Sequence, residues 1–170
     1  MNPLISYILQ FMLFLCFQVL ILDNDGMVLF DVATPFVFLL FLLMLPFDIP
    51  ILLMYVVAFS SGLLLDVLSD ASGLGLQAFA CLAAVGLRNR VAALISASNF
   101  RSLSEMNIRE QSSIWFVTYL FPLIFVHQFA WHFLEAMQFS LFFTVLWRAI
   151  CSSLYSFVFC YILAFLFYKK

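Results

Sequence analysis

The chain has 170 residues, 66% of them hydrophobic and only 9% charged, with a formal net charge of −2. A soluble domain has about 25% charged residues, so this composition predicts a single domain whose solvent is membrane lipid. The sequence offers no basic surface for nucleic acid, which argues against that class of partner.

Six apolar segments follow one another, and a membrane-spanning helix needs about 20 such residues. Residues 4–22 form the first. No basic residue precedes them and no small-x-small cleavage site follows, so we expect a retained helix rather than a signal peptide. The later segments are residues 32–45, 51–68, 74–95, 114–133 and 139–168. The sequence therefore predicts an all-α integral membrane protein, a compact bundle of six transmembrane helices in one domain, 1–170.

Two of these segments are shorter than a normal span. Residues 32–45 end at a tight turn, residues 46–50, that has proline at both edges. The fourth segment stays apolar only as far as Leu87. We expect Arg88 and Arg90 to end it or to lift it into the lipid headgroups.

The basic residues segregate to alternate connections, as the positive-inside rule requires of a correct helix count. With the N-terminus in the cytoplasm, the outer connections carry only acidic residues, namely Asp23, Asp25, Asp31, Asp66, Asp70 and Glu135. The cytoplasmic side carries the basic ones, namely Arg88, Arg90, Arg101, Arg109, Lys169 and Lys170. Both termini and residues 88–112 are therefore expected in the cytoplasm.

Small residues at four-residue spacing indicate which segments face protein, because lipid supplies no hydrophobic force between helices and close backbone approach must replace it. These residues are Ala58 and Gly62 in the third segment, Ala80 and Ala84 in the fourth, and Ser152, Ser156, Cys160 and Ala164 in the sixth. We expect these segments to pack against protein and the first two to face lipid. The alternative is that small residues are merely tolerated there.

The connection after the third segment is dense in residues that are costly in lipid, namely Gly62, Asp66, Asp70, Gly73 and Gly75. Two carboxylates four residues apart share one helix face. No nucleophile, metal set or phosphate loop accompanies them, which argues against a catalytic pair. A solvated helix end, a contact with a partner protein and a structural ion pair remain open. A cationic partner suits Asp66, because a carboxylate opposes the dipole at a helix C-terminus.

His127, His132 and Glu135 lie near the end of the fifth segment. A metal site needs three or four convergent ligands, and His127 falls on a different side of the helix from the other two. We therefore expect interfacial histidines and a capping carboxylate, with no metal and no cofactor. The four cysteines lie within apolar runs, in a spacing typical neither of disulfides nor of zinc sites.

Arg148 is the only basic residue inside an apolar segment, and it begins the four-residue series that ends at Ala164. We expect it to point toward protein and to pair with an acidic helix end, Asp66 first and Glu135 second. The alternative is that its long stem carries the guanidinium alone to the headgroups.

Four stretches resemble the MreD family, in the version found in Bacteroidetes-type bacteria. They are FQVLILDN at 17–24, FLLMLPFDIP at 41–50, GLLLDVLSDASGLGLQAF at 62–79 and FVHQFAWHFLEAMQFS at 125–140. The third is similar to the G-L-x-x-D-x-x-S-x-x-x-G-x-H-A segment of that family, with Gln77 where a histidine is expected.

The resemblance implies a non-catalytic scaffold of the bacterial inner membrane, in the cell-elongation complex that synthesises peptidoglycan and sets cell shape. Its partners would be membrane lipid, MreC, RodA with its transpeptidase, and the MreB filament. The residues alone leave a second class open. This is a small-molecule-binding subunit, similar in helix count to the substrate-binding component of an energy-coupling-factor vitamin transporter. The resemblance favours the scaffold.

Overall fold

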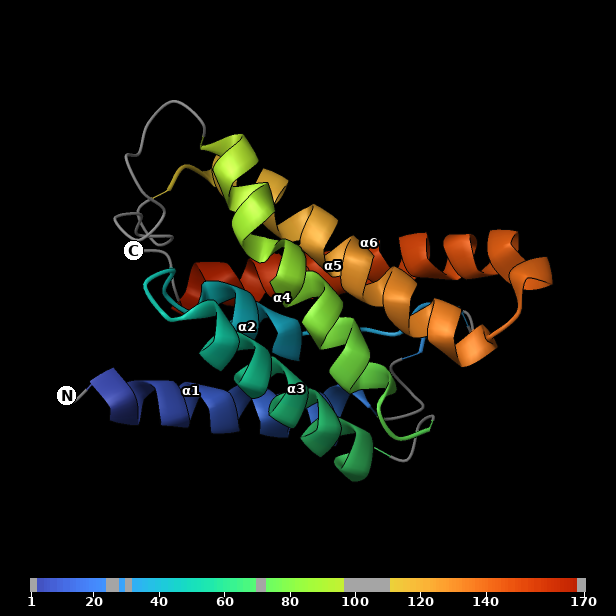
Figure 1. Cartoon of the computed structure of the whole chain (residues 1–170), viewed down its shortest axis with the longest axis horizontal. Coiled ribbons are helices and arrows are strands. Elements are labelled where there is room, and N and C mark those ends of the chain that lie inside the picture. The colour runs from blue at the N-terminus through green and yellow to red at the C-terminus, as the bar shows by residue number, and fades with distance from the viewer. Residues whose placement is uncertain (1–2, 24–27, 30–31, 70–72, 97–110, 168–170) are drawn as a thin grey trace.

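Helices make up most of the residues that this computed structural model describes, which are 3–23, 28–29, 32–69, 73–96 and 111–167 (Figure 1). The elements are α1 (Pro3–Phe17) with its π-helical continuation η1 (Gln18–Leu22), α2 (Phe38–Met44), α3 (Ile51–Leu68), α4 (Leu76–Ile95), α5 (Ser113–Ala136), the 3₁₀ turn η5 (Phe139–Leu141) and α6 (Phe142–Phe167). Among these residues there is no β-strand, only an isolated bridge between Leu29 and Ala33. The predicted all-helical class is confirmed.

Five helices in the described part are long and apolar enough to cross a membrane, namely Ile5–Leu22, Ile51–Leu68, Leu76–Ile95, Ser113–Ala136 and Phe139–Phe167. Their outer faces expose large apolar side chains. Leu52, Leu94 and Ile114, for example, are 73%, 79% and 80% exposed. A soluble monomer does not expose apolar surface on this scale, because water penalises it. These features are those of a multi-pass helical membrane protein.

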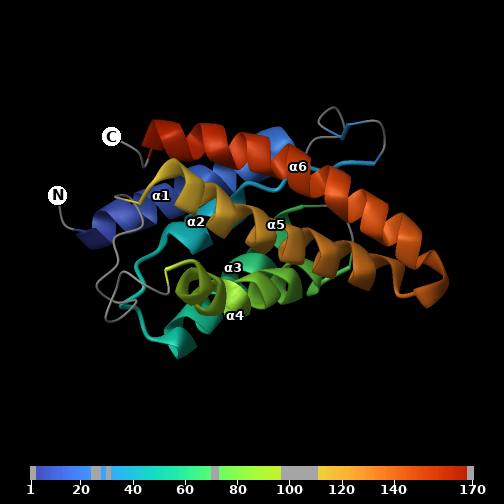
Figure 2. The ribbon, with the colours of Figure 1, turned by 90° about the horizontal axis from the view of Figure 1, so that it is seen from above.

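The bundle has two ends, and both α1 and α6 have a terminus of the chain at the same one (Figure 1). We name this the termini end; the turn at residues 45–50 lies there too. The opposite, distal end carries the connections that follow α3 and α5. Seen from above, α2 and α5 lie between a layer of α1 and α6 and a layer of α3 and α4 (Figure 2). α4 packs against α3 and α5, and α5 packs against α6.

The second apolar segment differs from the predicted helix over residues 32–45, because only Phe38–Met44 are helical. Pro35 supplies the reason, since proline has no N–H to donate and disfavours helical geometry at the residue before it. Residues 34–37 are non-helical, and all seven residues of α2 are buried, so the expectation that this segment faces lipid is wrong. The segment still runs from the distal end toward the termini end (Figure 1). The five non-helical residues 33–37 can extend by up to about 3.3 Å each, and the seven residues of α2 rise by about 1.5 Å each. Together they can span a distance of about 27 Å.

The expectation that Arg88 ends the fourth segment or lifts it into the headgroups is wrong. α4 continues to Ile95, and Arg88 is only 2% exposed. Its guanidinium donates to the Leu45 carbonyl and, through Nε, to Tyr119 Oη at 3.2 Å. It also lies 4.3 Å from the centroid of the Phe47 ring.

These contacts complete the C-terminus of α2. The Tyr119 hydroxyl donates to the Leu43 carbonyl at 3.0 Å, two residues before the carbonyl that Arg88 binds. The last carbonyls of a helix have no partner within the helix, and a cation there also complements the helix dipole. The charge of Arg88 is therefore used inside the bundle to hold α2, α4 and α5 together.

α3 and α4 approach each other closely at Gly62. A Cβ built on Gly62 would lie 2.4 Å from Ala78 Cα and 2.7 Å from Ala78 N. The neighbouring small residues of this contact, Ala58, Ala80 and Ala84, are fully buried. Such small residues let two membrane helices pack through their backbones.

Gly62→Ala should therefore lower the melting temperature of the detergent-purified protein. The added methyl group must displace the backbone of α4, and overpacking typically costs about 1–3 kcal/mol. Gly86→Ala is the matched control, because its Cβ would meet only the Tyr55 side chain, at an ordinary 3.6 Å. Alanine is also the better helix former by about 1 kcal/mol, so the control should be neutral or slightly stabilising. Equal melting temperatures for the two variants would contradict the close approach.

Candidate functional site

The non-helical stretch at residues 34–37 needs hydrogen bonds from side chains, because the bilayer offers its backbone no water. Gln18, at the start of η1, supplies several of them. Its Oε1 accepts from the N–H groups of Val37 and Phe38 at 2.8 and 3.4 Å. Its Nε2 donates to the Pro35 carbonyl at 3.2 Å and to Asp23 Oδ1 at 2.7 Å. Gln18 is 1% exposed, so one buried amide ties the end of the first crossing to the second.

α6 binds the same stretch from its other side. Ser156 Oγ accepts from the Phe36 N–H at 2.8 Å, and Ser152 Oγ accepts from the Thr34 N–H at 3.2 Å. From α5, Gln128 Nε2 donates to Ser156 Oγ at 2.9 Å and to the Thr34 carbonyl at 3.4 Å. The sequence predicted that this face of α6 packs through small residues. The structure adds that its hydroxyl groups bind a non-helical backbone.

Ser156→Ala should destabilise the protein by about 1–3 kcal/mol, because it leaves a buried N–H without its acceptor. Ser60→Ala is the matched control. The Ser60 hydroxyl is exposed and donates only to carbonyls of its own helix, Val56 and Val57. Its loss should be close to neutral, and Ser156→Phe should cost more than Ser156→Ala. Unfolding titrations in mixed detergent micelles measure all three variants. Equal stability of the two alanine variants would rule out the role assigned to Ser156.

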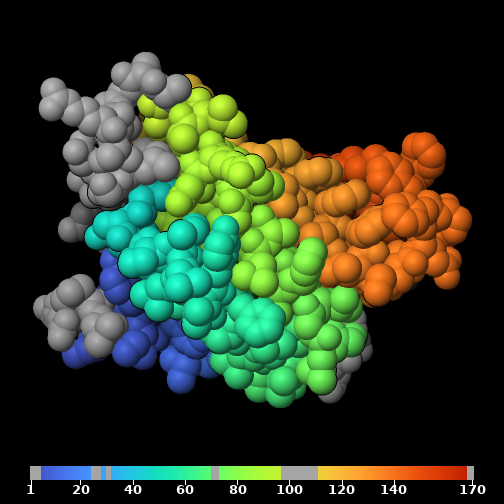
Figure 3. All heavy atoms as spheres, in the orientation of Figure 1, coloured from blue at the N-terminus to red at the C-terminus, as the bar shows by residue number. Residues whose placement is uncertain are grey.

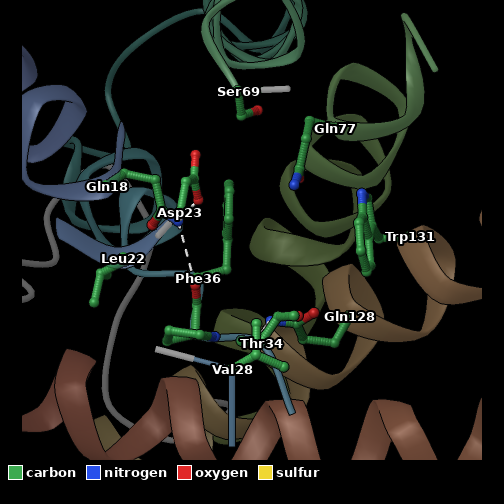
Figure 4. Close-up of a pocket in the computed structure, with 11 residues that line it drawn as sticks. Gln18, Leu22, Asp23, Val28, Thr34, Phe36, Ser69, Gln77, Gln128 and Trp131 are labelled. Carbon is green, nitrogen blue, oxygen red and sulfur yellow. Dashed lines mark hydrogen bonds between the residues drawn. The ribbon is translucent and has the colours of Figure 1, made fainter. Parts of the chain in front are cut away.

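A polar cavity of about 110 Å³ lies beside this network at the distal end. Figure 4 shows Gln18 and Asp23 facing Gln77 and Trp131 across it, with Ser69 at the end of α3 above them. Trp131 Nε1 and Gln77 Oε1 are buried atoms with no hydrogen-bond partner, and Trp131 is 8% exposed. Partial burial raises the pKa of Asp23 above its ordinary value, while the hydrogen bond from Gln18 acts in the opposite direction. The cavity thus holds an unpartnered donor and an unpartnered acceptor.

Asp66 joins α3 to the start of α4. It is 5% exposed, and its carboxylate accepts from the N–H groups of Gly75, Gln77 and Ala78 at 3.0, 3.0 and 3.3 Å. These are orphan donors at the N-terminus of α4, where the dipole favours a negative charge. Asp66 is therefore not a solvated helix end, and it forms no side-chain ion pair with any residue that the structure describes.

The structure describes Gly73 and Gly75 of this connection but not its second carboxylate, Asp70. Gly75, the residue before α4, has φ +99°, a left-handed conformation that glycine adopts without strain. Gly73 is exposed, with open space where a Cβ would lie. Asp70 lies outside the described residues, as do Asp25 and Asp31 and the basic residues Arg101, Arg109, Lys169 and Lys170.

The two histidines make different contacts, and only His132 lies beside Glu135. His127 stacks on the Phe36 ring, with centroids 4.2 Å apart, and its Nε2 lies 3.8 Å from Cys81 Sγ. His132 Nε2 lies 3.0 Å from Ser152 Oγ, and its Nδ1 lies 3.6 Å from Glu135 Oε2. Within the described ranges no three His, Cys, Asp or Glu side chains are grouped as metal ligands would be.

Arg148 does not pair with Asp66, and that prediction is wrong. The Asp66 carboxylate is occupied by the N-terminus of α4. Arg148 is exposed and lies with His132 and Glu135 around a second cavity, of about 270 Å³. The one ion pair found among the described side chains joins His132 to Glu135 and leaves Arg148 out.

Sequence reasoning missed the roles of Gln18, Gln128 and Tyr119. A buried glutamine inside an apolar run was the available signal, because an amide is costly in lipid unless it is bonded.

Comparisons of the chain with protein-family models, with curated proteins and with solved structures find no match.

Proposed function

We propose that this chain is a non-catalytic scaffold of the bacterial inner membrane, a subunit of the cell-elongation complex that binds MreC and neighbouring wall-synthesis proteins. The family resemblance of four ordered stretches supports the proposal. The observation that carries it is the use of the buried polar groups. Gln18, Gln128, Ser156, Asp66 and Arg88 each bind backbone atoms of another segment of the chain or a side chain that does so.

A bundle built in this way is a rigid body with an apolar perimeter. Its buried hydrogen bonds fix the positions of the helices, and its large exposed side chains offer packing surfaces to lipid and to other membrane helices. Close packing, rather than the hydrophobic effect, joins such surfaces in a membrane. The mechanism is assembly: the bundle holds its partners at fixed relative positions so that wall synthesis follows the filament.

The topology proposed with this function places the termini end in the cytoplasm. The reason is that the basic residues of the sequence segregate to one side of the predicted bundle. In single-cysteine variants, position 24 or 71 should react with a membrane-impermeant maleimide in intact spheroplasts. Position 104 should react only after permeabilisation, and labelling there in intact spheroplasts would overturn the topology.

Purification of the tagged protein from its native membrane tests the function. MreC and further wall-synthesis proteins should be retained, as identified by mass spectrometry. Gly62→Ala should retain less of them than the matched Gly86→Ala, because only the first displaces α4 from α3. If the folded wild-type protein retains none of these proteins, the scaffold proposal fails.

The unpartnered Gln77 and Trp131 atoms in the distal cavity favour the second candidate, a small-molecule-binding subunit. The volume argues against it. At about 110 Å³ the cavity is well below the roughly 300–1,000 Å³ of pockets for drug-sized ligands, a range that also suits a vitamin. Retention of a transport ATPase module in the same purification would favour this candidate over the scaffold.

A further inference from the structure

The cavity beside Arg148 lies in the hairpin that α5 and α6 form at the distal end. Its volume is about 270 Å³, equivalent to about nine water molecules at about 30 Å³ each. His132 and Glu135 line it from α5, and Thr144 and Arg148 line it from α6. None of these four side chains binds the backbone of residues 34–37 directly, and His132 is linked to that stretch only through Ser152.

The carboxylate and the guanidinium that line this cavity, those of Glu135 and Arg148, do not form an ion pair with each other. No ion pair within 4.0 Å joins Glu135 to Arg148 in the described part of the chain, although both line the same cavity. The Glu135 side chain is 40% exposed and Arg148 is exposed, so both are accessible. His132 is 4% exposed, and its Nδ1 has no hydrogen-bond partner. Its Nδ1 lies 3.6 Å from Glu135 Oε2 and its Nε2 lies 3.0 Å from Ser152 Oγ, so His132 holds the Glu135 carboxylate beside the cavity.

Helix length places the cavity at the level of lipid headgroups. From Phe167 at the termini end to Arg148 is 19 residues, or about 28 Å, close to the roughly 30 Å of a hydrocarbon core. From Ser113 to His132 is also 19 residues. The two side chains therefore lie near one boundary of the core when the helix ends lie near the other. Glu135 and the start of α6 lie beyond that boundary.

The shape and the surface of the hairpin agree with this depth. Its tip projects past the distal ends of α3 and α4 (Figures 1 and 3). Phe139 and Phe143 near the tip are 83% and 82% exposed, and Trp147 is 62% exposed. Aromatic side chains of this kind are typical of the membrane interface, where acyl chains meet headgroups.

We propose that this cavity binds the headgroup of a zwitterionic phospholipid that carries a primary ammonium group. Arg148 and the Thr144 hydroxyl bind the phosphate, for which a guanidinium has matched donors. The Glu135 carboxylate accepts from the ammonium group. The C-terminus of α5 reinforces the negative side of the cavity through its dipole. The acyl chains lie along Phe143 and Trp147, one turn apart on α6.

Native mass spectrometry of the full-length protein, released from detergent with defined lipids added, tests this assignment. Phosphatidylethanolamine should be retained about tenfold or more over both phosphatidylcholine and phosphatidylglycerol. The ammonium group of phosphatidylcholine has no hydrogen to donate, and phosphatidylglycerol has no ammonium group. Glu135→Gln should remove the preference for phosphatidylethanolamine while leaving phospholipid bound. Arg148→Gln should weaken all three lipids, and Arg148→Lys should restore part of the binding.

Arg90→Gln is the matched control, since Arg90 is an exposed arginine in α4 on the termini side of the buried Arg88. It should change nothing at this site. Melting temperatures without added lipid show whether each variant is folded, and both Glu135 and Arg148 are exposed enough to be replaced without disturbing the core. Equal retention of the three lipids by the wild type, or an unchanged preference in folded Glu135→Gln, would overturn the assignment.

Discussion

The need to hydrogen-bond a non-helical backbone inside the membrane determines the rest of this structure. Helices satisfy their own backbone groups, but residues 34–37 do not. The groups that satisfy them come from three other segments: Gln18 from η1, Gln128 from α5 and Ser156 from α6. These segments must therefore surround the stretch, which is why it and α2 lie in the middle layer of the bundle, away from lipid (Figure 2). Each unbonded amide in hydrocarbon would cost several kcal/mol, so the arrangement tolerates little displacement.

The same physical solution occurs at two helix ends. The carboxylate of Asp66 binds the first N–H groups of α4, and the guanidinium of Arg88 binds the last part of α2. In both cases a charged side chain of one helix completes the terminus of another, with the sign that the helix dipole favours. This explains how so apolar a chain keeps buried charges. Each charge replaces the water that a soluble protein would use at that helix end, and it fixes the angle between two helices.

The long apolar segments were predictable because length and composition decide them, and α3 begins and ends at the residues predicted, 51 and 68. The short helix α2 was not predictable, because the length of an apolar run does not distinguish a helix that spans the membrane from a half-helix. Pro35 was the available signal in the sequence. The position of Arg88 was not predictable from its charge, because its guanidinium is bound by a buried carbonyl and an aromatic ring and not by the headgroups. The partner of Asp66 lies 9–12 residues ahead in the chain, a distance that depends on the turn between two helices and that no helical periodicity describes.

Most of the polar groups that the fold leaves without a partner, among the described residues, lie toward one end of the bundle. Gln77 and Trp131 face one cavity and Glu135 and Arg148 another, and all four lie toward the distal end. Toward the termini end, Arg88 and Tyr119 bind backbone carbonyls instead. A polar group that stabilises the fold must be bonded within it, whereas one that binds a ligand must have a free bonding site in its absence. By this criterion the recognition chemistry of the described chain belongs to the distal end, while its lateral faces, being apolar, contribute packing.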